Sequence, residues 1–491
     1  MLKKTVYLLF VSLSISCAFG QLAATKNYVH DFEVFKTVLE EAHPSLYMYI
    51  SKAEWRKLVL QATQKVKQVE NDIEFMQLLS SLAYRIGDTH ISLSLKTELE
   101  NGTGRFVTPV QVVDGQIITT ANYQKLVQGS IIRKINNIPI SELMYRLSKY
   151  SFTDAINVKN ENQLIAKNFE RYLYYELGPQ DSFEVEYTDY GNTGTYTLTV
   201  DGSSEEFMFD RQQQAYDKLD FEMDEIIDIG NYPLDIVPRL TIDDDNTVAI
   251  LTIPNFAINQ RVFHILLYRY FAKLKQNAVQ NLIIDVRDNQ GGYIANAITL
   301  NAYLTGERNE NWWDSCYTRT LRLPLVNYAV DGNVTNQYLA SFGHKRVVDD
   351  KYMKYQSKAT NTSQPDIPIF IYRGNTFVLF DRYSFSAASE FAKFATENED
   401  IKTFGNESGA NAQAQTAGFF ADYVLPHSGI QLRFGLITFI TPYSSSYASQ
   451  RGIIPDQVIE PTLEDIYYGT DIQMKTLQEL IYHQYTNHFD D

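Results

Sequence analysis

The stretch Asn281-Leu-Ile-Ile-Asp-Val-Arg-Asp-Asn-Gln-Gly-Gly292 joins a short apolar run to a polar turn with paired glycines. The run is too short for a helix, so it predicts a buried strand. A strand over 248–253 and a helix over 261–275 precede it, and another helix begins near Ile294. Because strand and helix alternate here, the sequence predicts an α/β core over 246–470.

The rest of this core follows the same pattern. Ile369–Tyr372 and Phe377–Phe380 are predicted strands, and a helix is predicted from about 386 to 397. The last segment, 471–491, is predicted to form a C-terminal helix.

The region 21–100 has helical periodicity. Apolar residues recur at three- and four-residue steps from Phe32 to Leu39, and His43-Pro44 breaks the run. Further helices are expected to begin near Lys52 and Asp72. We therefore predict a helical N-terminal domain.

From residue 105 to 200 short strands alternate with turns, which predicts a small β module. An acidic linker over 201–245 follows it and ends in three consecutive aspartates. Within the module the predicted strands are 107–113, 116–120, 130–135, 183–188 and 196–200, and a helix is expected over 140–150.

Composition indicates a globular, multidomain chain. Its 491 residues are 44% hydrophobic and 21% charged, and 43 Lys and Arg against 59 Asp and Glu give a formal charge of −16. Nucleic-acid binding draws its affinity largely from cations paired with phosphates, so this balance argues against nucleic acid as a partner. It also argues against a polybasic membrane-surface protein.

The first 20 residues read as a signal peptide for export. Lys3 and Lys4 precede a short apolar run, and Ala18-Phe19-Gly20 places small residues before a cleavage point at Gln21. The expected location is periplasmic or secreted. An alternative takes Ser14-Ile-Ser-Cys17 as a lipobox, with a lipid anchor on Cys17. No later segment has 18 uncharged apolar residues, so no integral membrane segment is expected after cleavage.

Cysteine and histidine usage predicts neither a metal nor an organic cofactor. Cys17 and Cys316 are the two cysteines, so a cysteine-based zinc site is excluded, and no two histidines have the i, i+4 spacing of a helical zinc site. If Cys17 leaves with the signal peptide, no intrachain disulfide can form.

Three stretches carry residues suited to catalysis. The glycines Gly291 and Gly292 allow close backbone approach and can offer N–H groups as an oxyanion hole, although a strand followed by glycines can also be only a turn. A histidine at a helix–strand junction, His90 in Gly87-Asp-Thr-His90, can act as a general base. The alternative is a structural histidine.

The third stretch, Phe377 to Phe391, runs from a strand through a serine-bearing turn into an Ala-rich helix. A serine at a helix start lies in a positive field that favours developing negative charge. It can equally be a helix cap. The segment alone does not choose among Ser384, Ser386 and Ser389.

Together these stretches resemble the serine peptidases of the C-terminal processing and tricorn type, which include tail-specific proteases. Gly87-Asp-Thr-His90 is similar to that family's Gly-Asp-x-His box, 126–140 to its PDZ module, and Asp285–Gly292 to its Asp-x-Arg-x-Asn-x-Gly-Gly motif. Leu425-Pro-His-Ser-Gly429 and Gly452-Ile-Ile-Pro-Asp456 resemble later landmarks. The order of the motifs matches over nearly the whole chain after the signal peptide.

The resemblance implies a PDZ-like β module and a core similar to the crotonase/ClpP fold. It also implies Ser386 as nucleophile and His90 as base. The implied oxyanion donors are the N–H groups of Ala387 and of Gly291 or Gly292.

The chain departs from the family pattern in two places. The loop 405–411 lacks the lysine that serves as base in the C-terminal processing branch, and Lys393 and Lys402 are interpreted as solvated lysines. Where the tricorn branch has a glutamate, this chain reads Ser449-Gln-Arg451, so the sequence names no carboxylate to orient His90.

The sequence therefore predicts an exported serine peptidase that acts on peptides or proteins. The alternative is a catalytically impaired homologue that binds peptides or other ligands.

Overall fold

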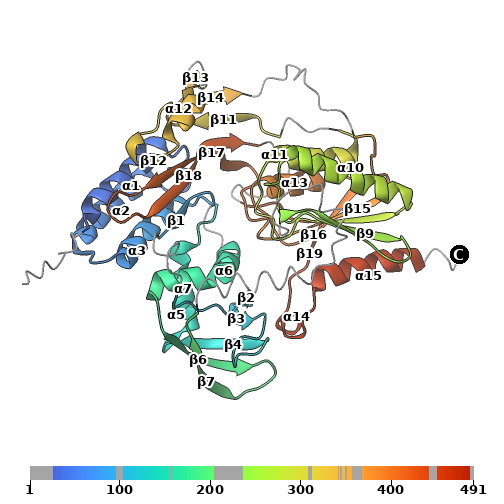
Figure 1. Ribbon diagram of the computed structural model, residues 1–491, viewed down its shortest axis with the longest axis horizontal. Helices are drawn as coiled ribbons and strands as arrows, with labels where there is room; N and C mark the ends of the chain where they lie inside the picture. Colours follow the sequence, from blue (N-terminus) through green and yellow to red (C-terminus); the bar gives the residue numbers. More distant parts are fainter. Residues whose placement is uncertain are drawn as a thin grey trace, which may run out of the picture.

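Over the residues it describes, the computed structural model shows three sheets with helices packed around them (Figure 1). The predicted signal peptide, Cys17 and most of the predicted linker lie outside the described residues. The structure describes residues 26–95, 103–154, 158–203, 236–307, 312–340, 342, 346–348, 351–355, 368–441 and 451–486.

The first sheet is the predicted α/β core. Its strands are parallel except at the β8–β9 edge, where they pair antiparallel. In spatial order they are β19 (Gln457–Val458), β16 (Ile401–Gly405), β15 (Asn375–Phe380), β10 (Asn281–Asp285), β9 (Val248–Thr252) and β8 (Arg239–Ile242).

Helices cover both faces of this sheet, which explains why β10 is buried along its whole length. One face packs on α10 (Gln260–Gln276), α11 (Ile294–Thr305) and α13 (Ala387–Thr396). The opposite face packs on α15 (Ile472–Thr486), the predicted C-terminal helix. Because the sheet is parallel, the loops after β10 and β15 emerge at the same edge.

The second sheet is largely antiparallel and combines distant parts of the chain. Its short strand β1 (Ser92–Ser94) pairs with β18 (Gln431–Ile440), so the end of the N-terminal helical region joins a late hairpin. The other members are β12 (Ala329–Val330), β17 (Ala414–Val424), β11 (Ser315–Thr318), β14 (Lys351–Tyr355) and β13 (Arg346–Val348). Helix α12 (Gly332–Ala340) contacts β17.

Three N-terminal helices pack against this sheet in one hydrophobic cluster (Figure 1). They are α1 (Tyr28–Ala42), α2 (Lys52–Lys65) and α3 (Asp72–Ala83), as predicted. Ser51 and Glu54 form a capping box that starts α2, and Asn71 caps α3. Helix α1 ends at His43-Pro44, since proline removes the N–H that another turn needs.

The third sheet belongs to the predicted β module. Its order is β2 (Val110–Val113), β3 (Gln116–Thr119), β4 (Ser130–Ile135), β6 (Ser182–Asp189) and β7 (Thr195–Asp201), with β5 (Ile138–Pro139) paired to β4. Three helices accompany it, namely α5 (Ile140–Leu147), α6 (Val158–Lys167) and α7 (Phe169–Leu177). A short helix, α14 (Leu463–Tyr468), packs against the sheet near β2 and β3.

The mixed α/β multidomain class is confirmed. One predicted strand is wrong, because Ile369–Tyr372 is irregular and the Tyr372 N–H bonds to the carbonyl of Tyr303 at the end of α11. In the part of the chain that the structure describes, no helix is both long and apolar enough to span a membrane.

Candidate active site

The chain turns sharply between β15 and α13, and Ser386 is the residue at the turn. Its φ of 50° and ψ of −122° lie in a region that residues with a Cβ rarely adopt. Ser386 occupies the N-cap position of α13 but makes no capping hydrogen bond. Its hydroxyl is therefore not engaged in holding the helix. A strained serine between strand and helix is an arrangement that exposes a nucleophile above a sheet.

The hydroxyls of the other two candidate serines already make hydrogen bonds. Ser384 is fully buried, donates to the Val286 carbonyl at 2.8 Å and accepts from the Asp381 N–H at 3.0 Å. Ser389 is buried too, and its Oγ lies 2.8 Å from Oγ of Ser408. The Ser384 hydroxyl holds the turn, and the Ser389 hydroxyl links α13 to the segment after β16.

The paired glycines lie directly against this turn. A Cβ on Gly291, which has a φ of +94°, would come within 2.7 Å of the Ser386 Cβ and 2.9 Å of the Ala387 nitrogen. A Cβ on Gly292 would come within 2.2 Å of the Ala257 nitrogen. Only glycine permits these approaches, so the glycine loop and the serine turn are packed at backbone contact.

The two glycines differ as hydrogen-bond donors. The Gly291 N–H already donates to Oδ1 of the buried Asn289 at 2.8 Å. Within the described residues, the N–H groups of Gly292 and Ala387 have no recorded acceptor. Ala387 is the first residue of α13, where an N–H has no partner inside the helix. Of the predicted pair of glycines, Gly292 is therefore the available donor.

Asn289 ties the two loops into one unit. Its carbonyl accepts from the Phe385 N–H at 3.0 Å, and its side chain donates to the Ile253 carbonyl at 2.8 Å. Together with its bond to Gly291, this fixes the glycine loop to the residue before Ser386.

His90 follows a left-handed turn at Gly87, just before β1. Its side chain is 12% exposed, and its Nδ1 lies 3.9 Å from Oδ1 of Asp88. The same Asp88 oxygen accepts from the His90 N–H at 2.7 Å. Asp88 therefore lies beneath His90, in a box that the sequence had singled out only for its histidine.

A second histidine meets the same carboxylate. His43, at the C-terminal end of α1, is fully buried and stacks on Phe434. Its Nε2 lies 3.0 Å from Oδ2 of Asp88. Asp88 is thus placed between two imidazoles, one buried and one at the edge of a cavity.

The surroundings keep Asp88 charged. Burial would raise its pKa, but the hydrogen bond and positive charge of His43, and the charge of His90, outweigh burial and lower the pKa. Asp154 is the neighbouring buried carboxyl, and it accepts from the N–H groups of Thr89 and Asn411, each at 2.9 Å. Burial and the negative charge of Asp88 raise the pKa of Asp154. Asp88 is therefore the better partner for an imidazolium.

A cavity of about 510 Å³ lies beside these parts. Its lining includes His90, Gln290 and Phe385, and the last two directly precede Gly291 and Ser386 in the chain. The structure thus brings His90 to the cavity that the serine and glycine loops also reach. The rest of the wall combines aromatic and aliphatic side chains with polar ones such as Ser80, Asn168 and Arg171.

The lysine that follows the nucleophile turn is not solvated as predicted. Lys393 is buried on α13, and its Nζ lies 3.2 Å from Oε2 of Glu390. Burial, opposed by Lys393, raises the pKa of Glu390 to about 7. The Lys393 prediction was wrong because the helix turns this face into the core, while Lys402 on β16 is exposed as predicted.

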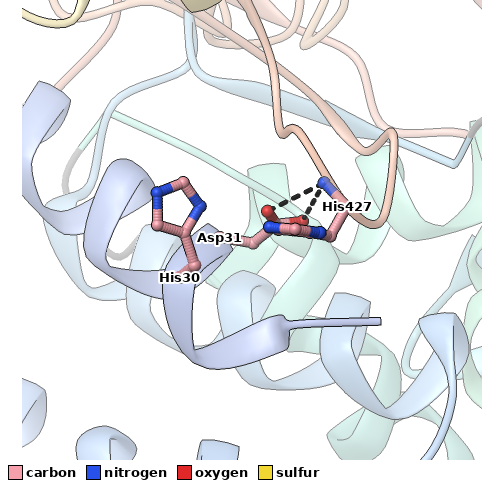
Figure 2. Close-up of side chains that lie close together, drawn as sticks. All are labelled: His30, Asp31 and His427. Carbon is pink, nitrogen blue, oxygen red and sulfur yellow. Dashed lines mark hydrogen bonds between the residues drawn. The ribbon is translucent and has the colours of Figure 1, made fainter. Parts of the chain in front are cut away.

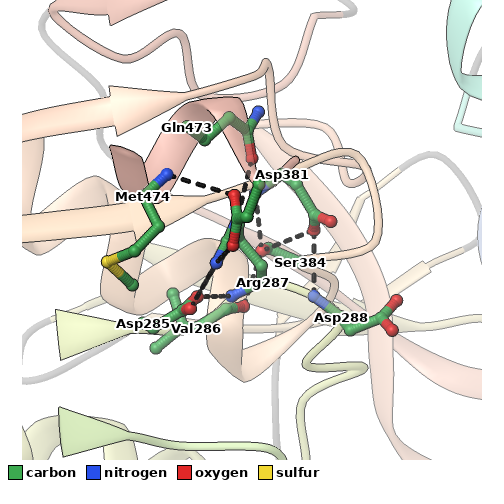
Figure 3. Close-up of polar contacts among 9 residues, drawn as sticks. Asp285, Val286, Arg287, Asp288, Asp381, Ser384, Gln473 and Met474 are labelled. Carbon is green, nitrogen blue, oxygen red and sulfur yellow. Dashed lines mark hydrogen bonds and ion pairs between the residues drawn. The ribbon is translucent and has the colours of Figure 1, made fainter. Parts of the chain in front are cut away.

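The Asp-x-Arg part of the glycine motif is an anchor (Figure 3). Arg287 donates to both oxygens of Asp285 at 3.0 and 2.7 Å and to both oxygens of Asp471 at 2.7 and 2.8 Å. Burial opposes ionisation of Arg287, but these two carboxylates raise its pKa. The loop after β10 is thereby fixed to the start of α15.

A second contact fixes the glycine loop to the serine turn. Oδ1 of Asp381 accepts from the Asp288 N–H at 3.1 Å (Figure 3). It also accepts from the Tyr383 N–H at 3.0 Å. From α6, Lys167 pairs with Asp288, and the Gln163 carbonyl accepts from the Tyr383 hydroxyl. Helix α6 of the β module therefore touches both loops.

Comparison with known proteins agrees with this geometry. Residues 247–459 match the family model described as Peptidase family S41. The chain superposes on "mature CPAF complexed with lactacystin" with a TM-score of 0.59 at 15% identity, over 95% of this chain and 99% of the other. Against "mature CPAF" alone the TM-score is 0.57 at 15% identity, over 90% and 94%. A search of curated protein sequences finds no match.

The family match indicates a hydrolase, a serine-type peptidase. The match of residues 247–459 to Peptidase family S41 supports a peptidase of the C-terminal processing type. The predicted peptidase is thus confirmed as a class, and the binding-protein alternative is not favoured. At 15% identity, the likeness to CPAF concerns the fold.

Proposed function

We propose that this chain is an exported peptidase that cleaves peptides or proteins with Ser386 as nucleophile and His90 as general base. Asp88 orients His90 and stabilises the imidazolium that forms during attack, and the N–H groups of Gly292 and Ala387 hold the oxyanion. The observation that carries the proposal is the turn at Ser386. Its backbone is strained, and its hydroxyl makes no capping hydrogen bond to α13. Strain of this kind is retained where function needs it.

In the first step, Ser386 Oγ attacks the scissile carbonyl and its proton passes to His90. The carbonyl oxygen becomes negative, and two backbone N–H groups can then donate to it. Such donors are each worth about 3 kcal/mol in the transition state. The positive end of α13 adds to the same effect at Ala387.

In the following steps the proton returns. The imidazolium of His90 protonates the leaving amine, which departs and leaves an acyl group on Ser386. A water molecule then attacks the ester, His90 takes its proton, and Ser386 is released with its hydrogen. Nδ1 of His90 is the nitrogen near Asp88, so Nε2 is left to exchange the proton.

The cavity supports a peptide with bulky apolar side chains. Its wall includes Tyr150, Phe152, Tyr172, Tyr175 and Phe420, and aromatic walls bury large apolar groups effectively. Arg433 at the rim is paired with Asp422 and lies over the Phe420 ring. We therefore expect cleavage beside aromatic or large aliphatic residues.

The β module is proposed to act as a PDZ-like binding site for substrate tails, and the α/β unit as a crotonase/ClpP-like core. Support comes from a pocket of about 220 Å³ between β2 and α6, since an edge strand can accept an added peptide strand. Arg382, from the serine turn, lines the same pocket. A tail bound there would contact the turn that carries Ser386.

Hydrolysis of a casein or quenched peptide substrate tests the catalytic pair. Ser386→Ala and His90→Ala should each lower kcat by on the order of 10⁴-fold, and the double variant should be little worse than either, because members of one catalytic unit are not additive. Lys402→Ala is the matched control and should keep full activity.

Two results would overturn the mechanism. One is full turnover by His90→Ala together with loss of turnover in a folded Lys393→Met variant, which would make lysine the base. The other is equal activity of Ser386→Ala and the wild type. Thermal melts of every variant separate lost chemistry from lost folding.

A further inference from the structure

Two histidines and an aspartate from opposite ends of the chain meet beside α1. His30 and Asp31 lie in the first turns of α1, and His427 lies in the turn between β17 and β18. Each side chain offers one ligand atom, and these atoms all lie within 4.8 Å of one another. Figure 2 shows the Asp31 carboxylate against His427, with the His30 ring beside them.

The carboxylate is held in place by the turn itself. Its Oδ2 accepts from the N–H and hydroxyl of Ser428, at 2.7 and 2.6 Å, and from the His427 N–H at 3.2 Å. Within the described part of the chain, Oδ1 accepts one bond, from the His427 N–H at 3.0 Å. Oδ1 therefore keeps a lone pair while its orientation is fixed, as the second shell of a metal site requires.

The two imidazoles, unlike the carboxylate, are exposed and, among the described residues, are not held by hydrogen bonds. Asp31 is fully buried, but His30 and His427 are exposed. Their rings meet edge to face, with centroids 5.3 Å apart, and no hydrogen bond to either ring nitrogen is recorded within the described residues. No hydrogen bond from these residues therefore opposes rotation of either ring toward a shared ion. The His30 ring also meets the Tyr328 ring edge to face, with centroids 6.1 Å apart.

We propose that His30, Asp31 and His427 bind a divalent transition metal of the zinc type, which cross-links α1 to the β17–β18 turn. Two imidazole nitrogens and one carboxylate oxygen favour zinc or its neighbours over magnesium or calcium. Ligand atoms about 2.0 Å from tetrahedral zinc lie about 3.3 Å apart. The present separations of up to 4.8 Å must therefore shorten by roughly 1.5 Å. Rotation of the two exposed rings can bring the ligand atoms that much closer.

This site is separate from catalysis. Its three residues are not among those that line the 510 Å³ cavity. The ion would join segments 396 positions apart in the chain, so its expected effect is on stability. With the fourth position left to water, the ion is removable by a chelator.

Calorimetric titration of the untagged, chelator-treated chain with ZnCl₂ tests the proposal. We expect one zinc per chain and a rise in melting temperature of about 3 °C at a hundredfold excess over Kd. His30→Gln and His427→Gln should each weaken binding at least tenfold. His264→Gln, at an exposed histidine on α10, is the matched control and should bind as the wild type does.

The result that overturns the site is the absence of a one-to-one zinc isotherm. Equal zinc binding by the wild type, His30→Gln and His427→Gln overturns it as well. MgCl₂ in the same titration should give no binding, and binding of magnesium as tight as zinc would contradict the assigned ligand chemistry.

Discussion

Two buried aspartates, Asp31 and Asp88, each lie beside two histidines, yet their partners differ. Asp31 accepts four hydrogen bonds from the backbone and hydroxyl of residues 427 and 428. Asp88 accepts one backbone bond, from His90, and otherwise faces imidazole nitrogens at 3.0 and 3.9 Å. A carboxylate satisfied by main-chain donors can fix a turn, whereas one that relies on imidazoles depends on their charge.

The exposure of the histidines adds a second difference. His30 and His427 are exposed beside Asp31, so a solute can reach them. Beside Asp88, His43 is fully buried and His90 reaches only the cavity. The first cluster is therefore suited to an external ion, and the second to moving a proton at the cavity.

The largest effect is expected from Asp88→Asn. Loss of the carboxylate should lower kcat on the order of 10²- to 10⁴-fold with little change in KM, because it stabilises the imidazolium that forms during attack. The acid limb of the pH–rate profile should also move to lower pH, which a purely structural role would not produce. Asp31→Asn is the matched control, and its folded fraction should retain the wild-type kcat. A kcat loss as large in Asp31→Asn would remove the distinction between the clusters.

A smaller effect, on the unfolding free energy, should distinguish His43 from His30. His43→Leu should destabilise the fold by about 3 kcal/mol, because it leaves the buried Asp88 carboxylate without its nearer partner. His30→Leu should change the unfolding free energy by less than about 0.5 kcal/mol without zinc, because His30 is exposed. Urea unfolding of both variants measures the two values. Equal losses would show that the His43 contact does not stabilise the fold.

The smallest effect concerns a buried carboxyl with no imidazole partner. Burial, together with the charge of Asp288, raises the pKa of Asp381 from 3.8 to about 6. The folded state then keeps a proton that the unfolded chain releases, so stability present below pH 4 is lost as the pH rises to about 6. Asp381→Asn keeps an acceptor but cannot titrate. Between pH 4 and 7 the unfolding free energy of Asp381→Asn should fall by about 2 kcal/mol less than that of the wild type. Urea unfolding at each pH measures both curves, and curves that run parallel would contradict this prediction.

The sequence predicted those parts of the molecule that local patterns determine. The three N-terminal helices, the strand before Gly291 and the helix after Ser386 all follow from periodicity and turn residues. The segment alone did not choose among three serines, and the family resemblance implied Ser386. The fold adds which hydroxyls are already bonded, namely those of Ser384 and Ser389.

Contacts between distant segments could not be predicted in this way. His43 and Asp88 meet only because α1 and the segment before β1 pack on the same sheet. The metal-ligating cluster was missed because its histidines lack helical spacing and come from α1 and a distant hairpin turn. Helices α6 and α7 were missed as well, within a module whose strands gave the clearer signal.

Labelling with a fluorophosphonate probe, followed by mapping of the modified peptide, tests the central claim most directly. We predict one label, on Ser386, that is absent in Ser386→Ala and forms at least a hundredfold more slowly in His90→Ala and Asp88→Asn. His30→Gln should label at the wild-type rate. A label on Ser384 or Ser389, or unchanged labelling of the His90 and Asp88 variants, would contradict the assignment of Ser386, His90 and Asp88 to one catalytic unit.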